Sequence, residues 1–238
     1  MKPAIKYFGG KSSMLKQINS FIPPPESYDI FIDLFGGSAS VLLSQDRPGK
    51  VEVYNDIYNN VYSLYKVISD KELFWEFKDK CDKALYCEQL REEAKEQLKN
   101  PDLSILDRAF YYFYFNRTSH NGHGGFSTNS CVRRGMSKST SDFLSCVDRL
   151  PQLHDRLSSV LILNKDIFKV IEKYNQENVF IYFDPPYHQS TRTDARYKHD
   201  FNNDQHELLI DKLLEFNGKA LVSGYKCKEY ERLEQKFK

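Results

Sequence analysis

The sequence of 238 residues lacks the features of exported, membrane-bound and metal-binding proteins. Its cysteines are odd in number and have no C-x-x-C spacing, so we expect neither a disulfide framework nor a zinc site. No apolar run is long enough to cross a bilayer and no signal segment is recognisable, which favours a cytoplasmic protein without membrane contact. The five cysteines are Cys81, Cys87, Cys131, Cys146 and Cys227.

The sequence also lacks a net charge of either sign, because 34 Lys and Arg face 33 Asp and Glu. A balanced chain has no global attraction to nucleic acid, so any DNA binding requires a local basic patch. Tryptophan occurs once, whereas 17 Phe and 16 Tyr are present. Most of these rings should fill the core, and the others are available as stacking surfaces.

Short apolar runs alternate with helical patterns, which predicts an α/β fold with a mainly parallel, Rossmann-like sheet. The expected strands are 30–34, 51–54, 160–163, 179–183 and 220–223. Asp204 and Glu207 have the spacing of a capping box for a helix before the last strand. Between the second and third strands the pattern becomes helical and highly charged. We therefore expect a core of residues 1–68 plus 158–238, interrupted by a helical insertion of residues 69–157.

The segment Asp184-Pro185-Pro186-Tyr187 directly follows the apolar run 179–183. Two prolines end strand pairing and block immediate helix entry, so the segment lies at the carboxyl end of a central strand. Open α/β sheets bind ligands at this edge. The Asp184 carboxylate and the proline carbonyls accept hydrogen bonds and Tyr187 adds a flat ring, which suits an aromatic amine such as the amino group of adenine. A simple strand-ending turn is the alternative.

A glycine turn, Phe35-Gly36-Gly37-Ser38, follows the first strand, and Asp56 follows the second. Small residues let a ligand approach the backbone, and an acid at this spacing binds ribose hydroxyls in such folds. No G-K-[ST] follows the glycines, which excludes a P-loop, and G-x-G-x-x-G is absent. A ligand with a nucleoside and a carboxylate but no phosphate fits best, and S-adenosylmethionine has this chemistry.

In three motifs the sequence resembles the Dam-type DNA adenine-N6 methyltransferases, whose order is glycine motif, target-recognition insertion and Asp-Pro-Pro-Tyr. The motifs are Lys6-Tyr7-Phe8-Gly9-Gly10-Lys11, Asp33-Leu34-Phe35-Gly36-Gly37-Ser38-Ala39-Ser40 and Asp184 to Tyr187. The family often has glycine where Ala39 stands. The resemblance implies a site-specific enzyme that transfers a methyl group from S-adenosylmethionine, leaving S-adenosylhomocysteine, to adenine N6 of a base flipped out of double-stranded DNA.

The resemblance also implies roles for individual residues. Asp184, Pro185, Pro186 and Tyr187 would be catalytic. Asp56 would hold the ribose and Asp166 with Ile167 the adenine of the cofactor, although Asp166 could instead be a plain helix N-cap. The remaining cofactor contacts would come from Tyr7, Lys11, Asp33, Phe35, Gly36, Gly37, Ser38 and Asp184.

The region from Arg117 to Arg149 is the best candidate for DNA recognition, because it holds five basic and two acidic residues. Within it residues 116–125 are expected to form a loop, and the resemblance implies an inserting segment at 116–122, in which His120 stands where relatives often carry an aromatic. Arg133 and Arg134 could read guanine edges or contact phosphates. The expected DNA contacts are Lys11, Arg117, Ser119, His120, Asn121, Gly122, Arg133, Arg134 and Lys138. A solvated basic loop is the alternative, above all for Lys138.

Two further expectations concern the end of the chain. Arg192, Arg196, Lys198 and His199 should form a polar loop that closes over the flipped base, anchored by Phe201. Relatives of this type continue with a β-hairpin beyond the last strand here. A monomer is expected, with exposed sheet edge, lower stability or self-association if nothing replaces that hairpin.

Two alternatives stay open at this point. Cytosine-N4 transfer attacks the same type of exocyclic amine, and a truncated, non-catalytic DNA- or cofactor-binding module would share the motifs. A cognate restriction endonuclease is a possible partner. No metal is expected, because none of the histidines has ligand spacing: His120, His123, His154, His188, His199 and His206.

Overall fold

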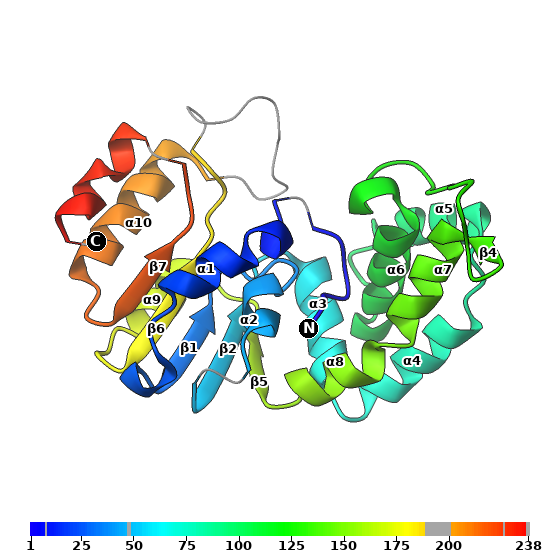
Figure 1. Cartoon of the computed structure of the whole chain (residues 1–238), viewed down its shortest axis with the longest axis horizontal. Helices are drawn as coiled ribbons and strands as arrows, with labels where there is room; N and C mark the ends of the chain where they lie inside the picture. The colour runs from blue at the N-terminus through cyan, green and yellow to red at the C-terminus, as the bar shows by residue number, and fades with distance from the viewer. Residues whose placement is uncertain (8, 47–48, 189–200, 226, 237–238) are drawn as a thin grey trace.

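The computed structural model describes residues 1–7, 9–46, 49–188, 201–225 and 227–236. A five-stranded parallel sheet with the order β5-β2-β1-β6-β7 forms its centre (Figure 1). The sheet strands are β1 (Ile30–Asp33), β2 (Val51–Asn55), β5 (Val160–Leu163), β6 (Val179–Phe183) and β7 (Lys219–Val222). The expected parallel α/β core is confirmed, and each strand end lies within one residue of its predicted position.

Side chains of alternate strand residues point to opposite faces of the sheet, and helices cover both faces. Ile32 and Ile181 pack on one face with α9 (Ile167–Lys173) and α10 (Asn203–Glu215). Phe31 and Phe180 pack on the other face. That face is covered by α1 (Leu15–Phe21), α2 (Ser40–Ser44) and α3 (Asn59–Ser69). Because both faces are buried, β6 is apolar at every position.

The helices between β2 and β5 stand beside the sheet, and α3 lies between the sheet and the other helices of this region (Figure 1). Helix α6 packs against α3, α4, α5 and α7 and is the centre of this group. A single buried cluster runs from Phe31 of the sheet through Val61 of α3 to Phe113 and Phe143. The inserted helices are α4 (Leu73–Lys83), α5 (Glu88–Gln97), α6 (Ile105–Thr118), α7 (Lys138–Val147) and α8 (Leu150–Leu157).

Short elements complete the fold. A two-stranded antiparallel hairpin of β3 (Val132–Arg133) and β4 (Met136–Ser137) precedes α7. The 3-10 helices are η1 (Lys11–Ser13), η2 (Pro25–Ser27), η3 (His120–Gly122) and η5 (Lys228–Gln235).

Two local predictions were wrong. Helix α6 extends to Thr118, so residues 116–118 are helical, where a loop was expected; the Thr118 hydroxyl donates to the Tyr114 carbonyl and satisfies the last turn. The capping box of α10 uses Asn202 and Gln205, not Asp204 and Glu207, because the helix begins at Asn203. Asn202 and Gln205 exchange side-chain to backbone hydrogen bonds of 2.8 and 3.1 Å. The predicted polar loop of Arg192, Arg196, Lys198 and His199 lies outside the described residues.

Candidate active site and DNA-facing surface

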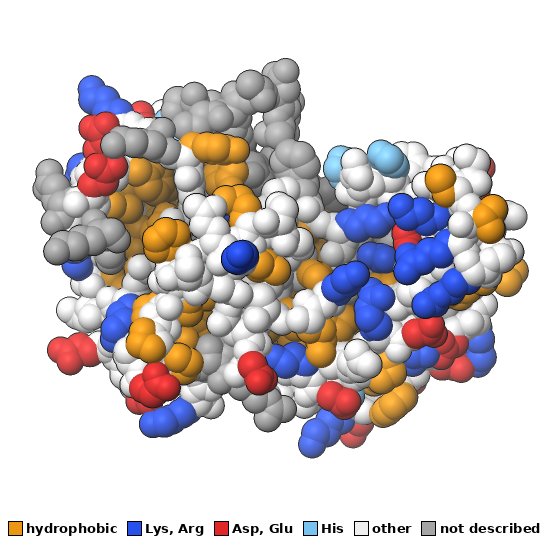
Figure 2. Space-filling model, viewed as in Figure 1, with side chains coloured by type: hydrophobic (Ala, Val, Ile, Leu, Met, Phe, Trp, Pro, Cys, Tyr) orange, Lys and Arg blue, Asp and Glu red, His pale blue; other side chains and the backbone are white. Residues whose placement is uncertain are grey.

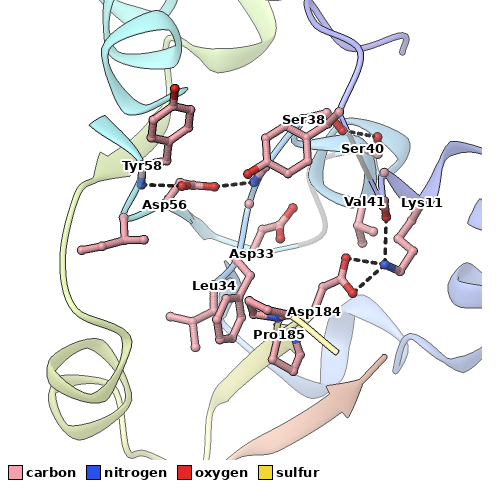
Figure 3. Close-up of a pocket in the computed structure, with 18 of the residues that line it drawn as sticks. Lys11, Asp33, Leu34, Ser38, Ser40, Val41, Asp56, Tyr58, Asp184 and Pro185 are labelled. Carbon is pink, nitrogen blue, oxygen red and sulfur yellow. Dashed lines mark hydrogen bonds and ion pairs between the residues drawn. The ribbon is translucent and has the colours of Figure 1, made fainter. Parts of the chain in front are cut away.

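The strand order brings the two main sequence motifs together. Strands β1 and β6 are direct neighbours, with Asp33 opposite Tyr182, although the chain runs through β2 and β5 between them. Their carboxyl ends form the topological switch point at which open α/β sheets bind ligands. The glycine turn after β1 and Asp184 after β6 line one cavity of about 750 Å³ (Figure 3). This is the juxtaposition that the sequence motifs required.

The glycine turn leaves no room for side chains at two positions. A Cβ atom on Gly36 would lie 2.1 Å from the Tyr54 ring. Gly37 has a φ of +48°, and a Cβ atom there would lie 3.0 Å from the ring of Tyr7. The Tyr54 hydroxyl donates to the Gly37 carbonyl at 2.7 Å, so the same ring that excludes a side chain also fixes the turn. The two glycines are therefore needed for the shape of the cavity wall.

Asp56 is held against this turn by backbone donors. Its carboxylate accepts hydrogen bonds from the Gly37 N–H at 2.8 Å and the Tyr58 N–H at 2.7 Å (Figure 3). Burial raises the pKa of Asp56 to about 6, although these two hydrogen bonds oppose the rise. The Asp33 carboxylate accepts from the Leu42 N–H at 3.3 Å. Burial raises the pKa of Asp33 further than that of Asp56, to about 8.

Asp184 forms an ion pair with Lys11, and the two heavy atoms are 2.6 Å apart (Figure 3). The ammonium group also donates to the Gly9 carbonyl at 3.0 Å, and only 6% of the Lys11 side chain is exposed. Burial raises the pKa of Asp184 and the nearby ammonium opposes that rise. Burial alone would lower the pKa of Lys11, but Asp184 more than compensates and the pKa is raised. Lys11, predicted as a cofactor and DNA contact, thus points at Asp184, the aspartate predicted to be catalytic.

The other residues of the Asp-Pro-Pro-Tyr segment differ in position: the two prolines line the cavity, and Tyr187 packs against neighbouring side chains. Pro185 and Pro186 line the cavity beside Asp184. The Tyr187 ring packs edge-on against Tyr225, with centroids 4.9 Å apart, and the Lys11 ammonium lies 5.0 Å from its centroid. The ring that was expected to stack on a base therefore lies next to the ion pair.

The opposite end of the cavity is aromatic. Asp166 and Ile167 line it as predicted, and Asp166 is also the N-cap of α9, because its side chain accepts from the Phe168 N–H at 3.0 Å. Phe35 meets Phe201 edge-on at 5.7 Å, and both rings line the cavity. Sequence reasoning missed Phe201 as a cavity residue, because nothing in the pattern shows that the start of α10 lies above the glycine turn.

The DNA-facing segment after α6 turns sharply. Asn121 and Gly122 have positive φ angles of 51° and 86°. His120 and Asn121 are exposed, whereas Ser119 and Gly122 are buried. Of the four residues predicted here as DNA contacts, His120 and Asn121 present side chains to solvent, and Ser119 and Gly122 shape the turn.

Two buried residues that the sequence reading missed hold this turn in place. The Asn116 amide donates to the Lys6 carbonyl at 2.7 Å and accepts from the Lys6 N–H at 2.8 Å, which ties the turn to the N-terminal segment. Arg91 of α5 donates to the Ser119 hydroxyl at 3.1 Å and to the Gly124 carbonyl, and it is 5% exposed. Arg91 lies in the charged stretch expected to face solvent, and no sequence signal distinguishes it from its exposed neighbours.

Basic side chains gather around α7 and the β3–β4 hairpin (Figure 2). Arg133 pairs with Asp142 at 2.7 Å, Arg134 donates to the Ser145 hydroxyl at 3.3 Å, and Lys138 is exposed. Arg149 donates to the Ser145 carbonyl at 2.8 Å. A chain with almost no net charge therefore carries a local basic surface on one side of its inserted helices.

Fold and site define the class: an α/β protein whose cavity lies at the switch point of a parallel sheet, where the glycine turn, the buried Asp56 carboxylate and the Asp-Pro-Pro-Tyr segment meet. The model of the D12 class N6 adenine-specific DNA methyltransferases matches residues 7–238, and the chain belongs to this family. Its reaction is therefore methylation of adenine N6 in DNA, which decides against cytosine N4.

Relatives from three kinds of organism are similar over most of their length. The Type II methyltransferase M.CviBI of Paramecium bursaria Chlorella virus NC1A is 26% identical over 98% of this chain and 90% of its own. M.MjaIII of Methanocaldococcus jannaschii is 28% identical, over 86% of this chain and 76% of the relative. M1.LlaDCHI of Lactococcus lactis subsp. cremoris is 25% identical, over 82% and 69%. These relatives share the Type II methyltransferase name.

No helix within the described residues has the length and apolar character needed to cross a membrane. The described part of the chain also contains no group of three or more His, Cys, Asp or Glu side chains placed to hold a metal ion.

Proposed function

We propose that this enzyme uses S-adenosylmethionine to methylate an adenine that is flipped out of double-stranded DNA into the cavity between Gly37 and Asp184. Residues 1–68 plus 158–238 would bind the cofactor and carry out the reaction. Residues 69–157 would recognise the DNA. The observation that carries the proposal is the shared cavity. The glycine turn with Asp56, which would bind the nucleoside, and the Asp184 carboxylate, which would accept the amine, line the same space.

The residues around the cavity fit this cofactor. Asp56 would accept the ribose hydroxyls, and Phe35 with Ile167 would enclose the adenine near Asp166. The backbone at Gly36 to Ser38 lines the cavity beside Tyr7 and Asp33, which suits the methionine portion of the cofactor. When bound, S-adenosylmethionine supplies a methyl group that a sulfonium centre makes electrophilic.

The protein's own contribution to the chemistry is to make a poor nucleophile better. The adenine amino group is a weak nucleophile because its electron pair is delocalised into the ring. The Asp184 carboxylate and the Pro185 carbonyl would accept its two hydrogens and so localise that pair on nitrogen. Lys11 keeps Asp184 ionised inside a buried site, and Tyr187 would stack on the base.

The target base cannot be reached inside a duplex, so it has to be extruded. His120 and Asn121 are exposed at the tip of the turn beside the cavity and would enter the space left by the base. Arg117, Arg133, Arg134 and Lys138 would hold the flanking DNA, with Ser119 and Gly122 setting the shape of the turn. The Type II names of the relatives support a restriction-modification setting, in which a cognate endonuclease would cut the same unmethylated sequence.

Asp184→Ala tests the proposal. Methylated nucleosides in digested DNA should disappear, whereas the fold should be largely preserved, which a cooperative thermal unfolding transition would show. Asp155→Ala, which removes an exposed acid from α8, is the matched control and should methylate normally. Unchanged methylation by Asp184→Ala would refute the role of the carboxylate.

A further inference from the structure

A second, smaller cavity of about 180 Å³ lies beside the first one. It is formed by the N-terminal segment, the end of α6, the turn after it and the start of α7. Lys6 lines both cavities, so the two are neighbours on either side of one side chain. The lining consists of polar residues: Lys6, Arg117, His120, Asn121, Ser127, Asn129, Lys138, Ser139 and Asp142.

Positive charge dominates this small cavity. Lys6, Arg117 and Lys138 contribute three cations, whereas Asp142 is the one acid among the lining residues. The Asp142 carboxylate is engaged by Arg133 at 2.7 Å, and Arg117 reaches only the Asp142 backbone carbonyl, at 3.1 Å. Among the described lining residues, the three cations therefore share one carboxylate, Asp142, which is already paired with Arg133.

Two further observations show that these cations are held in an unfavourable position. The Lys6 ammonium donates to the Ser119 carbonyl at a long 3.4 Å, and burial followed by the charge of Arg117 lowers its pKa. The buried Arg117 Nε has no hydrogen-bond acceptor among the described residues. Buried donors and like charges are costly unless an anion compensates them. An anion in the cavity would satisfy both groups.

We propose that Lys6, Arg117 and Lys138 form a binding site for one phosphodiester group of the target DNA strand. The site rests on the proposed function, because it places that phosphate next to the cavity that receives the flipped adenine. A guanidinium fork and two flexible ammonium groups suit a phosphate oxygen. Hydroxyls of Ser127 and Ser139, 3.2 Å apart, provide neutral donors on the same wall. The site positions the DNA strand along the protein through its phosphate and makes no sequence-specific contact with a base.

The first test is the salt dependence of DNA binding, measured by fluorescence anisotropy on a cognate and a scrambled duplex. Lys6→Gln keeps the backbone groups that bond Asn116, so the fold should be preserved. It should weaken binding about tenfold on both duplexes and reduce the slope of log K against log salt by about 1. Lys138→Gln, at an exposed position, should act in the same way. Lys99→Gln, at an exposed position that is not part of the cavity lining, is the control and should leave the slope unchanged.

The second test locates the phosphate. Single neutral methylphosphonates are placed in turn along the target strand, and binding to the unchanged protein and to Lys6→Gln is compared. A methylphosphonate at one position next to the target adenine should weaken DNA binding by the unchanged protein about tenfold. It should have little further effect on DNA binding by Lys6→Gln. The measurement is binding, so it can fail while methyl transfer by the enzyme stands, and loss of transfer in Asp184→Ala does not affect it.

Three results would overturn the proposal. The first is a loss with Lys6→Gln on the cognate duplex alone, which would mean that Lys6 reads a base. The second is the absence of any methylphosphonate position that couples to Lys6. The third is that inorganic phosphate raises the melting temperature of the unchanged protein but not of Lys6→Gln while DNA binding is equal, which would make the site one for a free anion.

Discussion

The two sides of the active-site cavity are built in different ways. On the proposed cofactor side, Gly37, Tyr54 and Asp56 are joined by buried hydrogen bonds that involve the backbone. On the proposed acceptor side, Lys11, from a distant part of the chain, is the one charged partner of Asp184 among the described residues. The first side depends on shape, and the second depends on charge.

This difference should decide how each side responds to change. A backbone cradle cannot be adjusted by moving a side chain, so steric changes there should abolish binding. An ion pair with a flexible lysine can separate when a substrate amino group arrives, so the acceptor side should tolerate changes of shape and respond to changes of charge and pH. The predictions below are ordered from the largest expected effect to the smallest.

Gly36→Ala should have the largest effect, on cofactor binding. Its Cβ atom would lie 2.1 Å from the buried Tyr54 ring, whose hydroxyl fixes the turn, so neither can move freely. We expect about a 100-fold loss of S-adenosylhomocysteine affinity by calorimetry. Gly125→Ala, where a Cβ atom meets nothing within 4 Å, is the control. Normal affinity in Gly36→Ala would show that the turn is flexible after all.

Lys11→Gln should affect the acceptor side through charge. Without the ammonium, the pKa of the buried Asp184 should rise further, because the interaction that opposes the effect of burial is lost. The carboxylate is the active form, so the rising limb of kcat against pH should move to higher pH. We expect a loss on the order of tenfold at pH 7 that is partly recovered at higher pH. Lys11→Arg keeps the charge and should preserve the pH profile. A uniform loss at all pH values would contradict a role through Asp184.

The sequence was sufficient for the parts of this comparison that depend on local patterns. Apolar runs located the five strands, because a strand buried on both faces must be apolar throughout. The acid and glycine motifs at strand ends located both walls of the cavity. Pairing between distant side chains was not accessible: Lys11 matched a motif but carried no sign that its partner is Asp184, 173 positions later in the chain.

Local hydrogen bonding also limited the sequence analysis. Asp204 and Glu207 fit a capping box as well as Asn202 and Gln205 do, and the latter pair forms it because the helix begins at Asn203. Arg91 and Asn116 are buried supports of the DNA-facing turn, yet their residue types are common on surfaces. The structure was required to show that these polar residues are internal.

The pH dependence of cofactor binding should follow the ionisation of Asp56, on the proposed cofactor side of the cavity. Asp56 has a pKa raised to about 6 from its ordinary value of 3.8. Its ionised form accepts hydroxyl hydrogens best, so affinity should rise with pH and level off above about 6, falling by up to about tenfold per unit below it. Asp56→Asn should bind weakly and without this dependence. A pH-independent affinity in the unchanged protein would exclude ionisation of Asp56 as the cause.

The contribution of Asp56 to the free energy of unfolding without cofactor should change with pH in the opposite direction to the cofactor affinity. The pKa of Asp56 is higher in the folded chain than in the unfolded chain, so between pH 4 and 6 the folded chain binds more protons. The contribution of Asp56 to stability therefore decreases as pH rises through this window and is constant above it. Asp56→Asn should flatten this part of the curve of unfolding free energy against pH.

Ala39→Gly should have the smallest effect and tests whether the cofactor side is strained. Ala39 is the N-cap of α2 and has φ 57° and ψ 25°, a left-handed conformation that costs a residue with a Cβ atom about 1–2 kcal/mol. Glycine removes this cost, but its greater freedom in the unfolded chain returns about 0.5–1 kcal/mol. Urea unfolding should therefore show a net gain of about 0–1.5 kcal/mol, with cofactor affinity unchanged. Because Ala39 follows the glycine turn directly, a gain in stability that came with weaker cofactor binding would mean that the strain at Ala39 helps to shape the pocket.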